Sequence, residues 1–163
     1  MLFRSILIGM PGSGKSTCGV LAAKALCKSF IDTDLLIQQQ QGAPLQEIIN
    51  QKGAAYFQKA EENCLCALTC ENAVIAPGGS AVLSAAAMAH LKALGKVVYL
   101  KISAENMRTR IKNITTRGIV LGKGGSLEEM YALRQPLYEA YADTVIVCDG
   151  LSVEQVVEQL VRQ

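Results

Sequence analysis

The chain has 163 residues, of which 50% are hydrophobic, a size and composition that fit one compact domain with an ordinary core. The 16 Lys and Arg residues against 14 Asp and Glu residues give a net charge of +2, which is too mild and too dispersed to indicate nucleic acid or anionic lipid as a partner. The N-terminal residues lack the features of a secretory signal, and no apolar run approaches the roughly 18 residues that span a bilayer, so we expect a cytoplasmic protein. Separately, we expect a monomer.

Segments typical of strands and of helices alternate along the chain. In chain order, the pattern predicts a strand at Ser5–Ile8, a helix at Ser16–Cys27, a strand at Ser29–Ile31, helices at Leu45–Gln51 and Ala54–Cys70, a strand at Ala73–Ala76, a helix at Ser84–Leu94, a strand at Val97–Ile102, helices at Ala104–Lys112 and Leu127–Tyr141, a strand at Thr144–Val147 and a helix at Val153–Val161. This alternation predicts a single doubly wound α/β domain over residues 1–163, with about five parallel strands flanked by helices. Right-handed crossovers bring the carboxyl ends of the strands to one edge of the sheet, where ligands bind.

The chain contains six cysteines, which we expect to be reduced in a cytoplasmic protein. Cys64, Cys66 and Cys70 have the closest spacing, but residues two apart on a helix point in different directions, and the C-x-x-C pair typical of zinc sites is missing. We therefore interpret the cysteines as small apolar residues of the core rather than as metal ligands.

One glycine-rich segment breaks the alternation of strands and helices. Residues 115–126 carry four glycines and two cations, Arg117 and Lys123, between two predicted helices. Two interpretations are open: a loose surface connection, or a mobile lid over about residues 113–126 that brings positive charge over bound phosphates. The remainder of the predicted site favours the lid.

A phosphate-binding pattern, G-x-x-x-x-G-K-[ST], is matched by Gly9-Met10-Pro11-Gly12-Ser13-Gly14-Lys15-Ser16-Thr17, between a predicted strand and a predicted helix. Its glycines let the backbone wrap a phosphate group with N–H groups pointing inward, and the following helix presents its positive end to the anion. In this pattern Lys15 reaches the β- and γ-phosphates of ATP, and the Ser16 hydroxyl binds Mg²⁺. A dinucleotide-binding fold would need G-x-G-x-x-G without the Lys-Ser-Thr sequence, so the segment indicates a P-loop.

A magnesium ion also needs a carboxylate, and the second predicted strand leads into two of them, Asp32 and Asp34. The third and fourth predicted strands end without one. We expect Asp32 to bind the metal, directly or through water, and Asp34 to face the pocket of the phosphate acceptor. Taken alone, Asp32-Thr33-Asp34 is equally typical of a helix N-cap.

The chain lacks the Asn-Lys-x-Asp motif with which GTPases read the base, and motor and transporter ATPases need larger domains. A small domain with a P-loop and a basic glycine-rich lid is the plan of nucleotide and metabolite kinases. Over nearly its whole length the chain resembles the shikimate kinase family, with a fold like that of nucleoside-monophosphate kinases. The matching segments are Gly9–Thr17, Asp32–Asp34, Gly53–Phe57, Glu61, Pro77–Gly79, Arg110, Arg117 and Arg134–Tyr138.

This resemblance implies transfer of the γ-phosphoryl group of ATP to a hydroxyl of shikimate, giving shikimate 3-phosphate for aromatic amino-acid biosynthesis, with Mg²⁺ as cofactor. It implies that Lys15, Asp34 and Arg117 are catalytic: Asp34 binds the acceptor and takes its proton, and the lid arginine meets the phosphates. An arginine at the position of Arg110 flanks the adenine in this family.

The resemblance also implies an acceptor site in a helical region that covers about residues 33–61 and continues into later segments. Arg134, from the R-x-P-x-Y motif, corresponds to the arginine that grips the acceptor carboxylate. Gly78, Gly79 and Gln58 occupy acceptor-site positions, and Gln58 stands where the family has an arginine that also holds the carboxylate.

Three departures from the family pattern concern the acceptor and the lid. The arginine of the Gly-Glu-x-x-Phe-Arg-x-x-Glu motif is Gln58, the third glycine of Gly-Gly-Gly is Ser80, and the lid sequence Arg-Pro-Leu-Leu is here residues 117–120, Arg-Gly-Ile-Val. An arginine pairs with a carboxylate through two parallel hydrogen bonds, whereas glutamine offers a neutral and shorter contact. Lys59 is a candidate substitute, although adjacent helical positions face different ways.

Three hypotheses follow for the function. The first is shikimate kinase; the second keeps the reaction but changes the acceptor to a homoserine-like hydroxy amino acid or a sugar acid. The third is a nucleotide-binding protein that has lost catalysis. The intact site counts against it: Lys15, Ser16, Asp32, Asp34 and Arg117.

Overall fold

Five parallel strands form the central sheet, in the order β2-β3-β1-β4-β5. The strands are β1 (Ser5–Ile8), β2 (Ser29–Asp32), β3 (Ala73–Ala76), β4 (Lys96–Lys101) and β5 (Thr144–Val147). The computed structural model describes residues 4–111, 119–121 and 125–163. Within this part of the chain, no helix is long and apolar enough to cross a membrane.

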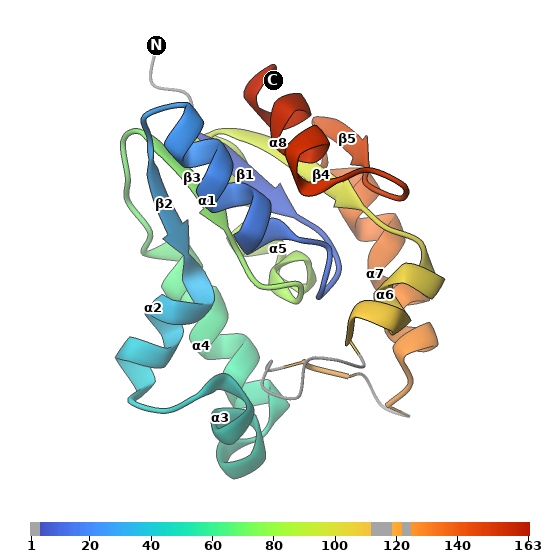
Figure 1. Ribbon diagram of the computed structural model, residues 1–163. Coiled ribbons are helices and arrows are strands. Elements are labelled where there is room, and N and C mark those ends of the chain that lie inside the picture. Colours follow the sequence, from blue (N-terminus) through green and yellow to red (C-terminus); the bar gives the residue numbers. More distant parts are fainter. Residues whose placement is uncertain (1–3, 112–118, 122–124) are drawn as a thin grey trace.

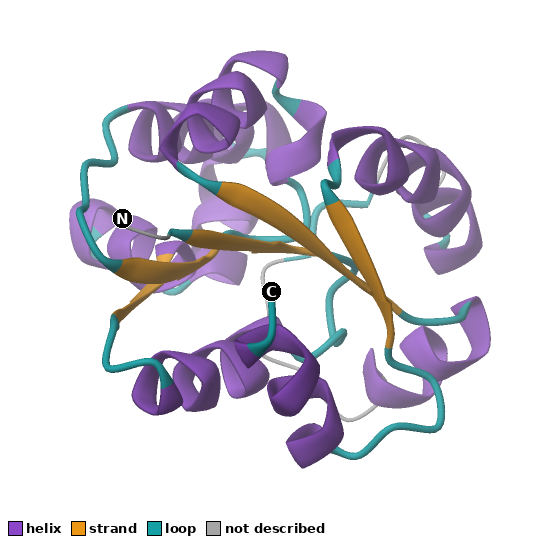
Figure 2. Cartoon of the chain, turned by 90° about the horizontal axis from the view of Figure 1, so that it is seen from above, coloured by secondary structure: helices purple, strands orange, loops and turns teal. Residues whose placement is uncertain are grey.

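The helices cover both faces of the sheet (Figures 1 and 2). They are α1 (Lys15–Ala25), α2 (Thr33–Gln41), α3 (Leu45–Lys52), α4 (Ala54–Cys66), α5 (Ala85–Leu94), α6 (Ala104–Ile111), α7 (Leu127–Tyr141) and α8 (Val153–Val161), with a short 3-10 turn, η1, at Ala81–Leu83. Helices α1 and α8 pack against each other, while α5 and α7 contact β4. The doubly wound α/β fold predicted from the sequence is confirmed.

The central strands have apolar, buried interiors because helices cover them on both sides. Every residue of β3 is buried, and so are Ile6, Leu7 and Ile8 of β1. In register, Ile6 of β1 lies beside Ile75 of β3 and Val97 of β4. The carboxyl ends of β1, β2 and β3 therefore reach one edge of the sheet as neighbours, and the loops that follow them meet there.

Helix α2, which begins within the Asp32-Thr33-Asp34 segment, was not predicted from the sequence. The Asp32 side chain begins this helix by accepting a hydrogen bond from the N–H of Asp34 at 3.0 Å, and Gly42 ends it in a left-handed conformation (φ 69°). Its polar run of four glutamines leaves only Thr33 and Ile37 buried, so it lacks the apolar periodicity that reveals a helix.

Helix α4 ends at Cys66, earlier than the predicted Cys70. The N–H of Leu68 bonds to the carbonyl of Leu65 at 3.2 Å in a tightened final turn, and the Leu68 side chain enters the main core. Burial of this leucine turns the chain toward β3.

The helices α2–α4 have a small apolar core of their own, separate from the core around the sheet. Its buried residues are Ile37, Leu45, Ile48, Phe57, Cys64 and Val120. These helices extend beyond the carboxyl edge of the sheet at the lower left of Figure 1. The acceptor-binding region predicted at about residues 33–61 thus corresponds to a distinct helical part of the molecule.

Candidate active site

The phosphate loop connects β1 to α1 and turns sharply at Gly14, whose φ of 93° favours glycine. Among the described residues, no side chain caps the N-terminus of α1, so its first N–H groups point toward the loop without a side-chain acceptor. The hydroxyl of Ser13 is buried and likewise has no partner in the described part of the chain. Such unsatisfied donors at a helix N-terminus form an anion-binding site.

Lys15, the first residue of α1, is buried beneath this loop. Its Nζ atom donates hydrogen bonds to the carbonyl oxygens of Gly9 at 2.8 Å and Met10 at 2.9 Å. These bonds hold the ammonium group at the mouth of the loop, where phosphate oxygens would approach.

Ser16 and Asp32 come together across the carboxyl edge of the sheet, although they are 16 residues apart in the sequence. The hydroxyl of Ser16 donates to Oδ2 of Asp32 at 2.8 Å, while Oδ1 of Asp32 accepts the N–H of Asp34. Asp32 therefore caps α2 and also faces the phosphate loop, so the two interpretations of the Asp-Thr-Asp segment are compatible. A hydroxyl and a carboxylate side by side are hard oxygen ligands of the kind Mg²⁺ prefers.

A cavity of about 240 Å³ opens beside this pair. Its walls come from several elements. Among the residues that line it are Lys15 and Ser16 of α1, Asp32 of β2, Asp34 of α2, Phe57 and Glu61 of α4, Gly78, Gly79 and Ser80 after β3, and Ile119. Lys15, predicted to bind phosphate, and Asp34, predicted to accept the proton, therefore line one cavity, as transfer between two bound substrates requires.

Gly78 forms the floor between two carboxyl groups of this cavity. A Cβ atom at this position would lie 2.8 Å from Oδ1 of Asp34 and 2.8 Å from Oε2 of Glu61. Any side chain here would displace them both, so the close approach requires glycine. Asp34 and Glu61 consequently flank one small space from opposite elements, α2 and α4.

Glu61 is buried, and burial raises the pKa of its carboxyl to about 7; the nearby charge of Asp34 also raises it, while a hydrogen bond from Ser80 and the charges of Arg134 and Lys15 lower it. The Ser80 hydroxyl donates to Oε1 at 2.6 Å. Among the described residues, the other oxygen, Oε2, has no hydrogen-bond partner. A buried carboxyl oxygen without a donor is a ready acceptor for a ligand hydroxyl.

Arg110 lies on the other side of the phosphate loop, in a cavity of about 420 Å³. Its guanidinium donates to the carbonyl of Gly12 at 3.0 Å. Apolar groups, including the side chains of Leu151, Val153 and Val156, form much of the rest of this cavity together with Thr17. A flat aromatic base fits such surroundings. The adenine was predicted to lie beside Arg110, which lines this cavity.

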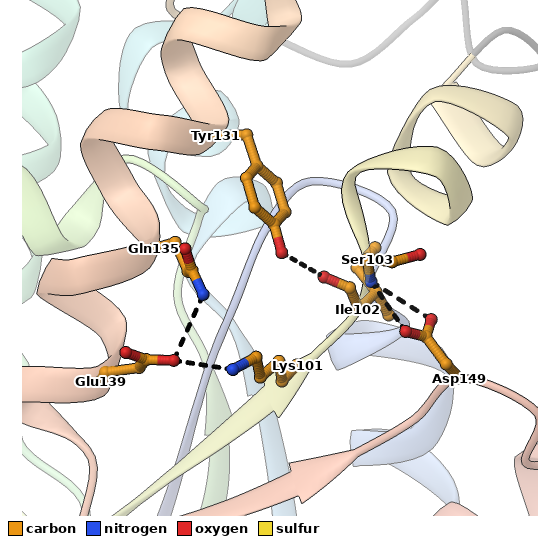
Figure 3. Close-up of polar contacts among 7 residues, drawn as sticks. All are labelled: Lys101, Ile102, Ser103, Tyr131, Gln135, Glu139 and Asp149. Carbon is orange, nitrogen blue, oxygen red and sulfur yellow. Dashed lines mark hydrogen bonds and ion pairs between the residues drawn. The ribbon is translucent and has the colours of Figure 1, made fainter.

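A polar network fixes the start of α6, which carries Arg110 (Figure 3). Both carboxylate oxygens of Asp149 accept the N–H of Ser103, at 3.2 and 3.0 Å, and the carboxylate also accepts from the side-chain amide of Asn106. The Tyr131 hydroxyl of α7 donates to the carbonyl of Ile102 at 2.9 Å. Helices α6 and α7 are thereby tied to the end of β4.

Gln58 and Arg134 lie along a separate cavity of about 630 Å³, which Asp34 does not line. Arg134 is buried, and its Nη2 atom donates to the carbonyl of Val120 at 2.5 Å, while Nε has no partner among the described residues. The structure therefore places Gln58 and Arg134 along one cavity but leaves both outside the walls of the Asp34 cavity.

Arg117 lies outside the described residues, as do most of the residues of the predicted lid. Of that segment, Ile119 lines the Asp34 cavity and Val120 packs into the core of α2–α4. Ser126, at its end, begins α7 by accepting the N–H of Glu129 at 3.1 Å.

Comparison with known proteins agrees with this arrangement. The family model described as shikimate kinase matches residues 11–163. A shikimate kinase of Francisella tularensis subsp. novicida (strain U112) is 36% identical over 158 residues, which cover 94% of this chain and 90% of that protein.

The chain belongs to the shikimate kinase family.

Solved structures extend the likeness to the fold. A shikimate kinase from Acinetobacter baumannii in complex with shikimate has a TM-score of 0.91 and 28% sequence identity, covering 99% of this chain and 92% of that one. The shikimate kinase of Aquifex aeolicus vf5 has a TM-score of 0.84 and 30% identity, covering 98% and 95% of the two chains. The predicted P-loop kinase fold is confirmed, and a member of the shikimate kinase family is a phosphotransferase that uses ATP and an alcohol acceptor.

Glu61, Ser80 and Ile119 line the Asp34 cavity but were not among the site residues predicted from the sequence. Glu61 was noted as part of a matching motif, Ser80 as a departure from one, and Ile119 as part of the lid sequence. The signal that could have revealed Glu61 is a carboxylate at a helical position between Phe57 and Leu65, both of which are buried. A charged residue on the buried face of a helix is rare without a functional or structural partner.

Proposed function

We propose that this protein transfers the γ-phosphoryl group of ATP to a hydroxyl of shikimate. The observation that supports this most strongly is the single cavity that joins Lys15 and Ser16 to Asp34 and Gly78. Membership of the shikimate kinase family names the acceptor.

In the proposed reaction, the phosphate loop and the N-terminus of α1 hold the triphosphate, with Gly9, Gly12, Ser13, Gly14 and Thr17 forming its wall. The Lys15 ammonium stabilises negative charge on the transferring group, because this cation lines the same cavity as Ser16 and Asp34. Arg110 flanks the adenine. A contact between Arg117 and the phosphates remains a prediction.

Mg²⁺ would be held by Ser16 and Asp32, together with phosphate oxygens and water. Their 2.8 Å contact fits an ion that uses few protein ligands and keeps several others from its substrate and solvent. When bound, it would neutralise charge on the β- and γ-phosphates.

Asp34 orients the acceptor hydroxyl and receives its proton as the oxygen attacks the γ-phosphorus and the bond to ADP breaks. Gly78 and Gly79 allow the acceptor to approach the backbone at this point; the Tyr138 hydroxyl fixes the Gly79 carbonyl at 2.6 Å. Arg134 is proposed to bind the acceptor carboxylate, with Gln58 nearby along the same cavity.

The test is a steady-state assay of the purified full chain with Mg·ATP and matched acceptors: shikimate, L-homoserine and D-gluconate. ADP release is measured by enzymatic coupling, and ³¹P NMR identifies the phosphate monoester. We expect kcat/KM for shikimate to exceed that for the other two by at least about 100-fold, because a site built around a substrate's polar groups rejects analogues that leave those groups unpaired. A higher value for homoserine or gluconate would establish a changed acceptor instead, and no turnover with any of the three would contradict the proposal.

A further inference from the structure

Ser80 and Glu61 form a buried hydrogen-bonded pair in the wall of the acceptor cavity. Both residues line the Asp34 cavity on one side and a second cavity, with Gln58 and Lys59, on the other. The hydroxyl of Ser80 donates to Oε1 of Glu61 at 2.6 Å, and both side chains are almost completely inaccessible to solvent.

The position of the Ser80 hydroxyl is set by its backbone. Ser80 immediately precedes η1, where its carbonyl accepts the N–H of Leu83 at 3.0 Å. The preceding residue, Gly79, is held by the Tyr138 hydroxyl. Ser80 is therefore on a constrained turn and donates from a fixed point.

No other side chain in the described part of the molecule donates to the Glu61 carboxyl. Lys59, two residues earlier on α4, pairs instead with Glu62 at 2.6 Å. Gln58 lines the second cavity beside the Ser80–Glu61 pair and the separate cavity along Arg134, but not the cavity that contains Asp34. The direction of the Glu61 carboxyl thus depends on Ser80.

With Oε1 bound to Ser80, the second oxygen faces the space above Gly78. The same point above Gly78 lies 2.8 Å from Oε2 of Glu61 and 2.8 Å from Oδ1 of Asp34. Two carboxyl oxygens that converge on one small space match two hydroxyl groups on neighbouring carbons of a single ligand.

We propose that Ser80 is a positioning residue for acceptor recognition: it holds Glu61 so that Oε2 accepts a hydrogen bond from a non-reacting hydroxyl of the acceptor, next to the hydroxyl that Asp34 engages. This inference rests on the proposed function, since it assigns a second contact within the same acceptor site. It makes Ser80 and Glu61 determinants of specificity for acceptors with adjacent hydroxyl groups.

The charges around Glu61 give this arrangement a pH signature. Asp34 of α2 faces it with like charge, Arg134 of α7 and Lys15 of α1 with opposite charge, and Cys64 lies close on its own helix. The pKa of the carboxyl is about 7, so its ionised and accepting form becomes dominant only above neutral pH. We therefore expect KM for shikimate to fall as pH rises through about 7, and the fall to move to higher pH when the Ser80 donor is removed.

The matched variants are Ser80→Ala and Ser84→Ala. Ser84 also donates to a glutamate of α4, Glu62, at 2.5 Å, but it does not line the Asp34 cavity. We expect Ser80→Ala to raise KM for shikimate about 10-fold, with kcat within about 3-fold and KM for ATP unchanged, as for loss of one hydrogen bond to a charged group. Ser84→Ala should leave all three parameters near the wild-type values.

In a second measurement, the wild-type protein and Ser80→Ala are each assayed with two shikimate analogues, each lacking one non-reacting hydroxyl. One analogue should lose about 10-fold in kcat/KM, and Ser80→Ala should lose much less with that analogue, because the contact is already weakened. Equal losses in both proteins, or a Ser80→Ala variant that behaves like Ser84→Ala with an unshifted pH profile, would overturn the inference. If the wild-type protein does not phosphorylate shikimate at all, the proposed function itself fails, and the inference fails with it.

Discussion

Lys15 holds the phosphate loop through hydrogen bonds and is also proposed to be catalytic. Replacing it therefore tests both roles. Replacing it with alanine removes the two hydrogen bonds to the phosphate loop and the only lysine at the mouth of that loop in the described structure. We expect Lys15→Ala to lower kcat by about 10³-fold, in the range known for removal of a group that stabilises transition-state charge. Thermal denaturation should show a folded protein with a loss of about 1–3 kcal/mol at most.

Lys24→Ala is the matched control, because Lys24 lies exposed in the last turn of the same helix. Its kcat should equal that of the wild type within error. Near-normal turnover in Lys15→Ala would contradict the catalytic assignment of Lys15.

Glu61 should make the stability of the protein depend on pH. Burial raises the pKa of its carboxyl from 4.5 in the unfolded chain to about 7 in the fold. Between these values the folded state keeps a proton that the unfolded state has released, so the free energy of unfolding falls as pH rises. The loss approaches about 3 kcal/mol by pH 8.

Glu61→Gln mimics the protonated form and should remove this dependence. Urea denaturation at pH 5 and pH 8 should give a smaller difference between the two pH values for Glu61→Gln than for the wild type. Glu62→Gln is the control: the salt bridge and hydrogen bond from Lys59 lower the pKa of Glu62, so its titration lies below this window. An unchanged pH dependence in Glu61→Gln would mean that Glu61 is not the group responsible.

The Asp149 carboxylate holds the start of helix α6. Asp149 accepts the N–H of Ser103 (Figure 3). It also accepts a hydrogen bond from the amide of Asn106, and α6 then carries Arg110 to the phosphate loop. We expect Asp149→Ala to raise KM for ATP several-fold, since Arg110 loses its fixed position, and to destabilise the fold by about 1–3 kcal/mol. Both are measured by steady-state kinetics and chemical denaturation.

Glu139→Ala tests the neighbouring part of the same network. Glu139 pairs with Lys101 at 2.7 Å, and both side chains are substantially exposed, so the ion pair contributes about 0–1 kcal/mol. KM for ATP should not change. An equal effect of the two variants on KM for ATP would show that Asp149 has no special role in placing α6.

At the scale of the whole molecule, the predicted site lies where the sheet core meets the separate core of α2–α4. The residues that line the Asp34 cavity come from both parts, so bound ligands bridge them. Ligands that bind only the folded state stabilise it by mass action. We expect Mg·ATP at about 100 times its dissociation constant to add roughly 2.7 kcal/mol, a rise in Tm of about 5–10 °C.

Differential scanning fluorimetry measures this shift, with Mg²⁺ alone as the control. Addition of shikimate after Mg·ATP should raise Tm further, because the second substrate also contacts both parts. No shift with Mg·ATP at millimolar concentration would contradict the nucleotide site.

The sequence by itself determined the fold class and the phosphate half of the site. Both depend on local information: buried strands read as short apolar runs, and the P-loop is one continuous segment in which Gly9–Thr17 supply glycines, lysine and hydroxyl in fixed order. Parallel strands share a carboxyl edge, so Asp32 and Asp34 at the end of β2 lie at the same edge as this loop, although β3 separates β2 from β1.

Only the tertiary structure decided the arrangement of the acceptor half. Helix α2 has too few apolar positions to be predicted from the sequence. The contact of Ser80 with Glu61 joins residues 19 apart, and no local sequence pattern specifies this pairing. The burial of Arg134 beneath the Val120 carbonyl and the separation of Gln58 from the Asp34 cavity likewise depend on how α4 and α7 pack. The physical reason is that the predicted phosphate site uses the backbone of one continuous segment. The predicted acceptor site uses side chains from several elements, and their directions are fixed only when the sheet core and the core of α2–α4 pack against each other.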